Sequence, residues 1–189
     1  MPRQIYLDGY TDAGVIVSLR LVNELTSSTE RQREIVASIL SFDPASIAAF
    51  RPRQIPGFVS LSQRLRQVIG HLLSEDIEAA AGVLNEMLAE HPAHPHLAKE
   101  EGRWRLHHHP ADAELVPMYI AICSEALARM IGEGLADRFG RCEASGCDIV
   151  FFDTTKNGTR RFCSTTCQSR TKTAAFRRRQ RPSGGARRR

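Results

Sequence analysis

Four cysteines close to the carboxyl end are the residues of this sequence best suited to chemistry. Their spacing is Cys142-x4-Cys147-x15-Cys163-x3-Cys167, whereas a fifth, Cys123, lies outside the group. Each close pair can reach one ion, and the intervening segment is long enough for a hairpin that brings the two pairs together. Thiolates are soft ligands, and four of them in a tetrahedron suit zinc, with Zn–S distances of about 2.3 Å. We therefore expect these four cysteines to bind one structural Zn²⁺ ion per chain.

Two other uses of four cysteines compete with zinc. A pair of disulfides is opposed by a reducing cytosol, because residues 1–10 contain the charged Arg3 and Asp8 and lack the apolar stretch of a secretion signal. An iron–sulfur cluster would need spacings that this sequence lacks. A catalytic zinc keeps an open coordination position, which four thiolates would close. Residues 141–189 also contain few large apolar side chains, so we expect the metal to stabilise their fold.

The charge of the chain is divided between two regions. The formal net charge is +5, of which residues 1–140 carry −5 and residues 141–189 carry +10. A Zn(Cys)4 centre would lower the second value to about +8, which still favours a polyanionic partner. We expect this partner to be duplex DNA, although a solubilising tail that binds any polyanion weakly has the same composition. The candidate DNA contacts are Arg160, Arg161, Arg170, Lys172, Arg177, Arg178, Arg179 and Arg181.

The segments around the cysteines predict a hairpin followed by a helix. Residues 149–153 form a short β-type run, Asn157-Gly158 is a turn pair, and residues 159–163 can return as the second strand. Ser164 is a suitable N-cap for a basic helix over about residues 165–179. The exposed N–H groups at the start of that helix would favour a thiolate at Cys167. The arrangement resembles a treble-clef zinc finger.

The region before the finger is predicted to be mainly α-helical. Apolar residues such as Val15, Leu19 and Val22 recur at spacings of three and four, which is typical of one helix face. Pro56-Gly57 should interrupt the pattern, and Pro117 should cause a kink or a later helix start. No apolar run approaches the length of about 18 residues that a membrane span needs, so we expect no membrane contact. The predicted helices have apolar faces over about residues 15–25, 35–40, 44–50, 61–72, 77–88 and 115–130. The second is expected to begin with a capping box at Ser27 and Glu30, the fifth to begin at Ser74 and the last to be capped by Asp112, and a β-hairpin is expected over residues 97–107.

Several of these segments resemble a known family. The stretch Arg141-Cys142 … Cys147-Asp148-Ile149-Val150-Phe151-Phe152-Asp153 … Arg160-Arg161-Phe162-Cys163-Ser164 … Cys167 is similar to the CGNR-type zinc finger. The final tetrad is Cys167-Gln168-Ser169-Arg170, so its cysteine and arginine match the family and its two middle residues depart from it. Upstream, Leu21-Val22-Asn23-Glu24-Leu25 and Trp104-Arg105-Leu106-His107 resemble the ABATE domain, which commonly precedes this finger. The resemblance implies a stress-induced bacterial transcription regulator.

The remaining polar and aromatic residues give weaker signals. All seven histidines lie between His71 and His109, at spacings that fit no standard metal site, so a polar hairpin with one packed histidine is expected. Trp104 is predicted to anchor the core, and in an alternative it lines a small-molecule effector pocket with His107. Cys123 is predicted to be a buried thiol. There is no Gly-x-Ser-x-Gly, P-loop or dinucleotide motif, so we do not expect an enzyme.

Together these features predict a mainly α protein with three parts. Residues 1–135 would form a helical ABATE-like effector or dimerisation domain, residues 136–181 a zinc finger with a basic helix, and residues 182–189 a flexible Arg-rich tail. The leading hypothesis is a cytoplasmic transcription regulator that binds DNA, as a homodimer because one small finger reads few base pairs. The alternative is a protein-interaction adaptor without sequence-specific DNA binding. A third hypothesis, an enzyme that uses a pocket of the helical domain, has less support.

Overall fold

The computed structural model describes residues 13–26, 30–92, 94–100, 102–107 and 112–180. Five of the sequence expectations concern residues outside these ranges: the start of the chain, the cap at Ser27, His108 and His109, Arg181, and the tail over residues 182–189. The described elements are α1 (Ala13–Glu24), α2 (Gln32–Leu40), α3 (Pro44–Ala49), η1 (Pro52–Gln54), α4 (Ile55–Leu73), α5 (Ile77–Glu90), β1 (His96–Glu100), β2 (Arg103–His107), α6 (Leu115–Gly132), η2 (Ala136–Arg138), β3 (Phe139–Arg141), β4 (Val150–Phe152) and α7 (Thr165–Gln180).

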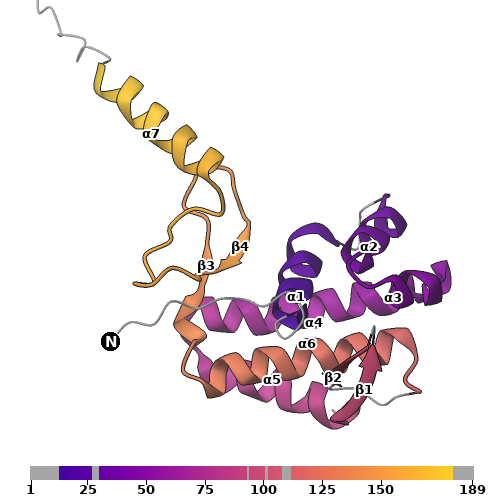
Figure 1. Ribbon diagram of the computed structural model, residues 1–189. Coiled ribbons are helices and arrows are strands. Elements are labelled where there is room, and N and C mark those ends of the chain that lie inside the picture. Colours follow the sequence, from indigo (N-terminus) through magenta and orange to yellow (C-terminus); the bar gives the residue numbers. More distant parts are fainter. Residues whose placement is uncertain (1–12, 27–29, 93, 101, 108–111, 181–189) are drawn as a thin grey trace, which may run out of the picture.

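The body of the molecule is a helical bundle built from the long helices α1, α4, α5 and α6 (Figure 1). Helix α1 packs against α4 and α6, and α5 packs against the same two helices. Gly14 allows the close approach of α1 to α6, because a Cβ at this position would lie 2.5 Å from the carbonyl oxygen of Ile122. The buried faces contain the leucines, valines and isoleucines whose helical spacing predicted them, so the mainly α fold is confirmed.

Proline positions explain where the predicted helix boundaries shift. Pro56 lies in the first turn of α4, where the backbone N–H groups need no partner inside the helix, so α4 begins at Ile55 and is not interrupted. Pro117 is the third residue of α6 and is tolerated for the same reason. The predicted cap at Asp43 is confirmed, since its carboxylate accepts hydrogen bonds from the N–H groups of Ala45 and Ser46, both at 3.1 Å.

The C-terminal end of α1 is held by two side chains of α4. The Ser62 hydroxyl donates to the carbonyl oxygens of Leu21 and Leu25, each at 2.9 Å. The Arg66 guanidinium donates to the carbonyl oxygens of Val22 and Leu25. Carbonyl groups at a helix end have no partner within the helix, so these contacts satisfy them and fix the direction in which α1 ends.

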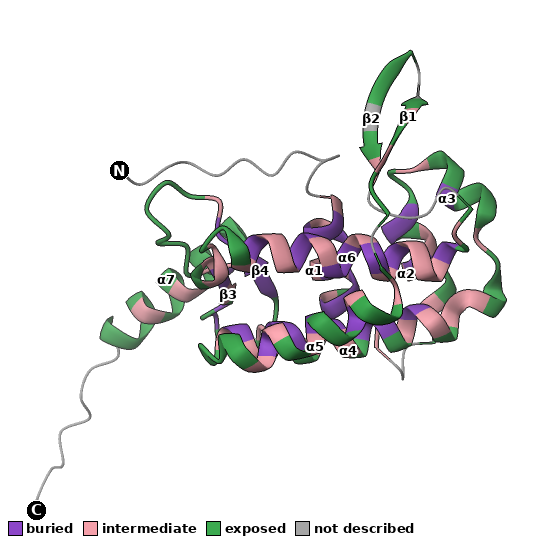
Figure 2. Ribbon diagram, turned by 90° about the horizontal axis from the view of Figure 1, so that it is seen from below, coloured by how far each residue is buried: buried purple, intermediate pink, exposed green. Residues whose placement is uncertain are grey.

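The first hairpin has the predicted turn but a different environment. Strands β1 and β2 pair antiparallel, with Leu97 opposite Leu106, and Gly102 adopts φ +81° in the turn between them. Figure 2 shows this hairpin as a largely exposed projection from the bundle. Trp104 is 67% exposed, so the prediction that it anchors the core is wrong. Its position on a two-stranded ribbon without a packed face leaves the indole in solvent.

The second hairpin differs from the predicted one. The run over residues 149–153 does contain a strand, β4, but its partner is β3, with Phe139 opposite Phe152. Residues 159–163 form no strand. The reason is packing: Phe139, Val150 and Phe152 are buried in the core of the bundle, and the Phe139 and Phe152 rings meet edge to face at 5.0 Å. Gly158 still turns the chain, with φ +63°.

Helix α6 is long and apolar enough to cross a membrane by length and composition. The expectation that no apolar segment approaches the length of a membrane span is therefore wrong. Although α6 contains Glu125 and Arg129, the mean hydropathy of its 18 residues is still high enough, at 1.4. In the described structure α6 packs against α1 and α5, and it buries Tyr119, Cys123 and Leu127 in the bundle core. Its apolar composition is thus that of a core helix.

Candidate metal centre

The four clustered cysteines come from two short segments, residues 142–147 and 163–167, that follow the bundle. Cys142 directly follows β3, and Cys147 lies in a tight turn where its N–H donates to the Ala144 carbonyl at 3.0 Å. Gly146 provides the positive φ of this turn, +70°. Cys163 precedes α7, and Cys167 lies in the first turn of that helix. Ser164 caps α7 as predicted, because its hydroxyl accepts the Cys167 N–H at 3.2 Å.

The sulfur atoms of these cysteines have the separation that a tetrahedral ion requires. Cys163 Sγ is 3.6 Å from Cys167 Sγ, and Cys147 Sγ is 3.8 Å from both. All four sulfurs, including that of Cys142, lie within 4.8 Å of one another. Zn–S bonds of about 2.3 Å in a tetrahedron give S–S separations of about 3.8 Å, whereas a disulfide needs about 2.05 Å. The four cysteines are therefore positioned to bind one zinc ion, as predicted.

Without an ion the surroundings favour the thiolate at Cys142 and oppose it at Cys163. The Cys163 N–H donates to Cys142 Sγ at 3.4 Å. Burial raises the pKa of the Cys142 thiol, but hydrogen bonds from the N–H groups of Cys163 and Ala144 outweigh it and lower the pKa to about 7. Burial and the neighbouring sulfurs raise the pKa of Cys163 to about 12. Four thiolates so close together would need a cation between them, and a zinc ion held by these cysteines would supply structural cross-linking and charge neutralisation.

Asp153 organises the loop that connects β4 to the second cysteine pair. Its buried carboxylate accepts the N–H groups of Thr155 and Arg160, both at 2.7 Å. Burial raises the pKa of this carboxyl, but the Thr155 hydroxyl, the two N–H groups and the positive charge of Arg138 outweigh burial and lower the pKa below its ordinary value. The sequence analysis did not single out this residue. Its signal is an aspartate two residues before a threonine, the pattern of an Asx-turn.

Three of the predicted DNA contacts are used inside the finger. The Arg160 guanidinium donates to the carbonyl oxygens of Phe162 and Cys163 and stacks over the Phe151 ring, 4.6 Å from its centroid. Arg161 forms an ion pair with Glu143. Arg170 donates to the Ser145 carbonyl at 3.3 Å and lies 3.8 Å from Cys167 Sγ, so its charge faces the sulfur cluster.

Four other predicted contacts point into solvent from α7. Lys172, Arg177, Arg178 and Arg179 are exposed, and within the described part of the chain none of them has a hydrogen bond or an ion pair. The helix contains no acidic residue, and Figures 1 and 2 show it extending away from the bundle with a largely exposed surface. Lys172 and Arg179 share one side of the helix with Phe176, where they line a broad hollow of about 1060 Å³.

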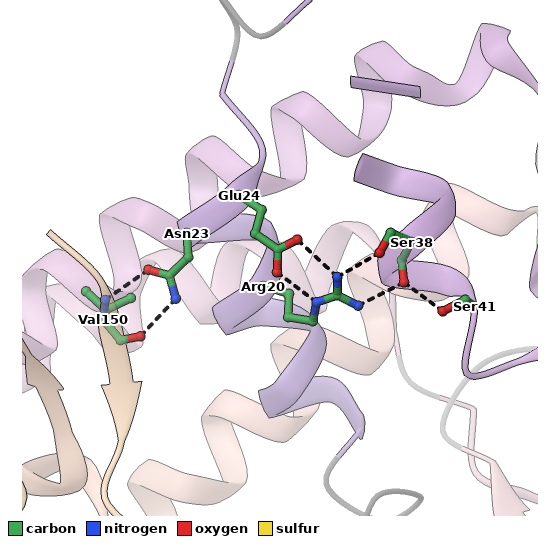
Figure 3. A network of polar contacts seen from close by, with 6 residues as sticks. All are labelled: Arg20, Asn23, Glu24, Ser38, Ser41 and Val150. Atoms are coloured by element: carbon green, nitrogen blue, oxygen red, sulfur yellow. Dashed lines mark hydrogen bonds and ion pairs between the residues drawn. The ribbon is translucent and has the colours of Figure 1, made fainter. Parts of the chain in front are cut away.

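Asn23 joins the finger to the bundle (Figure 3). From α1, its side-chain amide donates to the Val150 carbonyl at 2.9 Å, and its carbonyl oxygen accepts the Val150 N–H at 2.9 Å. The side chain therefore continues the β-ladder at the free edge of β4. One turn earlier, Arg20 binds Glu24 and the Ser38 carbonyl, which ties α1 to α2. Sequence reasoning quoted Asn23 within a family motif but assigned it no contact, because its partner is 127 residues away.

The predicted effector pocket at Trp104 and His107 has not gained support. Trp104 is exposed, and His107 stacks on His96, with ring centroids 5.2 Å apart. Neither residue lines the broad hollow beside α7 or a second cavity of about 310 Å³ between the bundle and the finger. The pocket at these two residues stays a prediction.

Comparisons with known proteins agree with this architecture. Residues 138–180 match the family described as "CGNR zinc finger". Residues 20–139, more than half of the chain, match the ABATE family, described as "Putative stress-induced transcription regulator". No curated protein matches the chain. The matched families are those of a regulator and a zinc finger, and neither is a family of enzymes.

Proposed function

The chain belongs to the ABATE family and carries a CGNR zinc finger, and from this we propose that it is a transcription regulator that binds duplex DNA through α7. The zinc finger would fix the start of α7, while the helical bundle would serve as an effector or dimerisation domain. We place the bundle domain at residues 1–135, the finger at 136–181 and an Arg-rich tail at 182–189. The proposed protein acts in the cytoplasm as a homodimer, since one helix reads few base pairs.

The observation that carries the proposal is the free basic surface of α7. The helix has 16 residues and is therefore about 24 Å long, with a diameter suited to the major groove, which is about 12 Å wide. Its four unpaired basic side chains, Lys172, Arg177, Arg178 and Arg179, contribute little to the packing of the finger. Within the described residues only Cys167 of α7 is buried, so the helix gains little from packing on its own protein, and a polyanionic partner would explain its basic side chains.

The three arginines that bind within the finger have a different proposed role. Arg160, Arg161 and Arg170 would position α7 and balance the charge of the metal centre. The main phosphate contacts would then be the four side chains of α7 together with Arg181, which lies outside the described residues. Arginine also reads guanine bidentately in the major groove, so the same side chains could supply sequence preference.

The proposal is tested by the salt dependence of duplex binding, measured by fluorescence anisotropy with zinc-loaded protein. Each neutralised phosphate contributes about 0.9 to the slope of log affinity against log salt, so four contacts contribute about 3.6. This corresponds to a loss of about 150-fold in affinity between about 50 and 200 mM salt. Replacing the four α7 side chains with glutamine should reduce the slope by about 3.6.

A matched control is available on the bundle and the first hairpin. The exposed side chains of Arg33, Arg53, Lys99 and Arg103 have the same composition and, within the described residues, no ion pair. Their replacement with glutamine changes the net charge equally but should leave the slope within about one unit of the original value. Equal slopes in the two quadruple variants would contradict DNA contact through α7. Selection of genomic fragments with both variants would then show whether binding prefers particular sequences.

A protein-interaction adaptor is the second candidate, and one observation favours it. Phe176 is 59% exposed on α7 and, with Phe162, gives the hollow beside the helix an apolar component. An adaptor should retain a protein partner in pull-down but show no preference among genomic fragments. Phe176→Ser should abolish binding of that protein partner, and it should leave the slope of log affinity for duplex DNA against log salt unchanged.

A further inference from the structure

The cavity between the bundle and the finger has the properties of a ligand site. Its volume is about 310 Å³, within the range of about 300–1,000 Å³ that is common for small-molecule pockets. Helices α1 and α4 form one wall, and the loop between β3 and β4 forms the other. The half-buried Leu73 and the 37% exposed Ile149 supply the accessible apolar surface, which suits an occupant with an apolar body.

The charged groups of this cavity favour an anion. Arg66 donates to the carbonyl oxygens of Val22 and Leu25, and no carboxylate of the described residues pairs with it, so only carbonyl dipoles at the end of α1 offset its charge. Arg141 provides a second guanidinium at the rim. Its partner Asp148 is 3.8 Å away with a side chain that is 95% exposed, so this ion pair is weak and open to competition.

An occupant of the cavity would also contact the metal-binding loop. Ile149 lines the cavity, and its carbonyl accepts the N–H of Cys142 at 2.9 Å. Ile149 is also two residues from Cys147, so it lies in the same metal-binding loop. Asn23 and Val150, whose hydrogen bonds join α1 to β4, also line the cavity. A small molecule in this cavity could therefore touch both α1 and the backbone that supports the metal ligand Cys142.

We propose that this cavity binds a small organic anion, a carboxylate with a compact apolar body. The carboxylate lies between Arg66 and Arg141, and the apolar body contacts Leu73 and Ile149. This inference does not rest on DNA binding by α7, and its test contains no DNA. It places the effector site at the junction with the finger and not at Trp104 and His107.

The test uses the zinc-loaded full chain and two fluorinated probes, observed by ¹⁹F NMR titration. 4-Fluorobenzoate should bind at least tenfold more tightly than 4-fluorobenzylamine, which has the same ring and the opposite charge. Gly70→Leu provides a blocking variant, because Gly70 lines the cavity and a Cβ at this position meets nothing within 4 Å. It should weaken 4-fluorobenzoate binding at least tenfold.

Gly82→Leu is the matched control, since Gly82 also lies inside a helix with open space at its Cβ position but does not line the cavity. It should leave the affinity unchanged. Asp148→Asn removes the carboxylate that competes for Arg141, so it should strengthen 4-fluorobenzoate binding about threefold. Equal binding of the two probes would overturn the proposal. So would unchanged binding in Gly70→Leu, or weaker binding in Asp148→Asn.

Discussion

Removal of the Asn23 side chain should loosen the finger from the bundle. Asn23→Ala deletes both hydrogen bonds to Val150, each 2.9 Å long. Val150 is 5% exposed, so its N–H and carbonyl would lose partners in a largely dry place. Each unsatisfied buried group costs about 1–3 kcal/mol, and water that enters the adjacent cavity would recover part of that loss. We expect the free energy of unfolding to fall by about 2 kcal/mol.

Urea denaturation followed by circular dichroism measures this change. With a slope of about 2 kcal/mol per molar urea, the midpoint should move down by about 1 M. Alanine also favours a helix more than asparagine does, by up to about 0.7 kcal/mol, and this gain has to be subtracted.

Asn85→Ala supplies that correction, because Asn85 lies exposed on α5 and makes no hydrogen bond within the described residues. If Asn23→Ala and Asn85→Ala shift the urea midpoint equally, the reasoning about the Asn23 clamp is refuted.

Three further predictions concern the metal, the helix packing and pH. Elemental analysis should find about one zinc per chain; Cys163→Ser should lose it, whereas Cys123→Ala should keep it, and retention in both variants would contradict the four-cysteine site. Gly14→Ala should destabilise the protein by about 1–3 kcal/mol in thermal melting, because its Cβ would overlap Ile122, while Gly70→Ala should be neutral or stabilising. Burial raises the pKa of Cys123 to about 12 from an ordinary value of 9.0, so its contribution to stability is complete below pH 9 and is lost as the pH rises toward 12. The free energy of unfolding should therefore fall by about 2 kcal/mol between about pH 8 and 10.5, and Cys123→Ala should remove this part of the decrease, whereas an identical decrease in both proteins would assign it to other groups.

The metal site could be predicted from the sequence because its information is local. Two close pairs of cysteines separated by the length of a hairpin permit few arrangements. The sulfur atoms of all four, from Cys142 to Cys167, indeed lie within 4.8 Å of one another. The helices of the bundle were predictable for a similar reason, since a buried face repeats within each segment. The cap at Ser164 was predictable for the same reason, because its hydroxyl accepts a hydrogen bond from the N–H of Cys167, which is only three residues further along the chain.

The errors concern choices that are made over long distances. The turn pair Asn157-Gly158 does turn the chain, but the hairpin expected around it does not form. Strand β4 pairs with β3 instead, because this pairing buries Phe139 and Phe152 against the bundle. Local signals could not rank these two pairings of the same strand. The prediction for Trp104 was wrong for a different reason. A large aromatic side chain is usually buried, and nothing nearby in the sequence indicates that the ribbon formed by β1 and β2 is exposed.

Charge alone also did not separate the arginines by role. Arg160 and Arg170 have the same composition signal as Arg178, yet the first two donate to carbonyl groups of the finger and the third faces solvent. The distinction depends on which carbonyl oxygens the loop brings close to each guanidinium. That information exists only in three dimensions.

The burial of Phe139, Val150 and Phe152 in the main core limits how this protein can be dissected. A C-terminal fragment that begins at β3 would keep the four cysteines and α7, but Phe139, Val150 and Phe152 would be exposed to solvent. The N-terminal fragment would have a cavity in its core where these side chains pack. Neither half would behave as a self-contained cassette for domain swapping or fusion. Loss of the metal should therefore also destabilise the packing of α4, because α4 contacts β3.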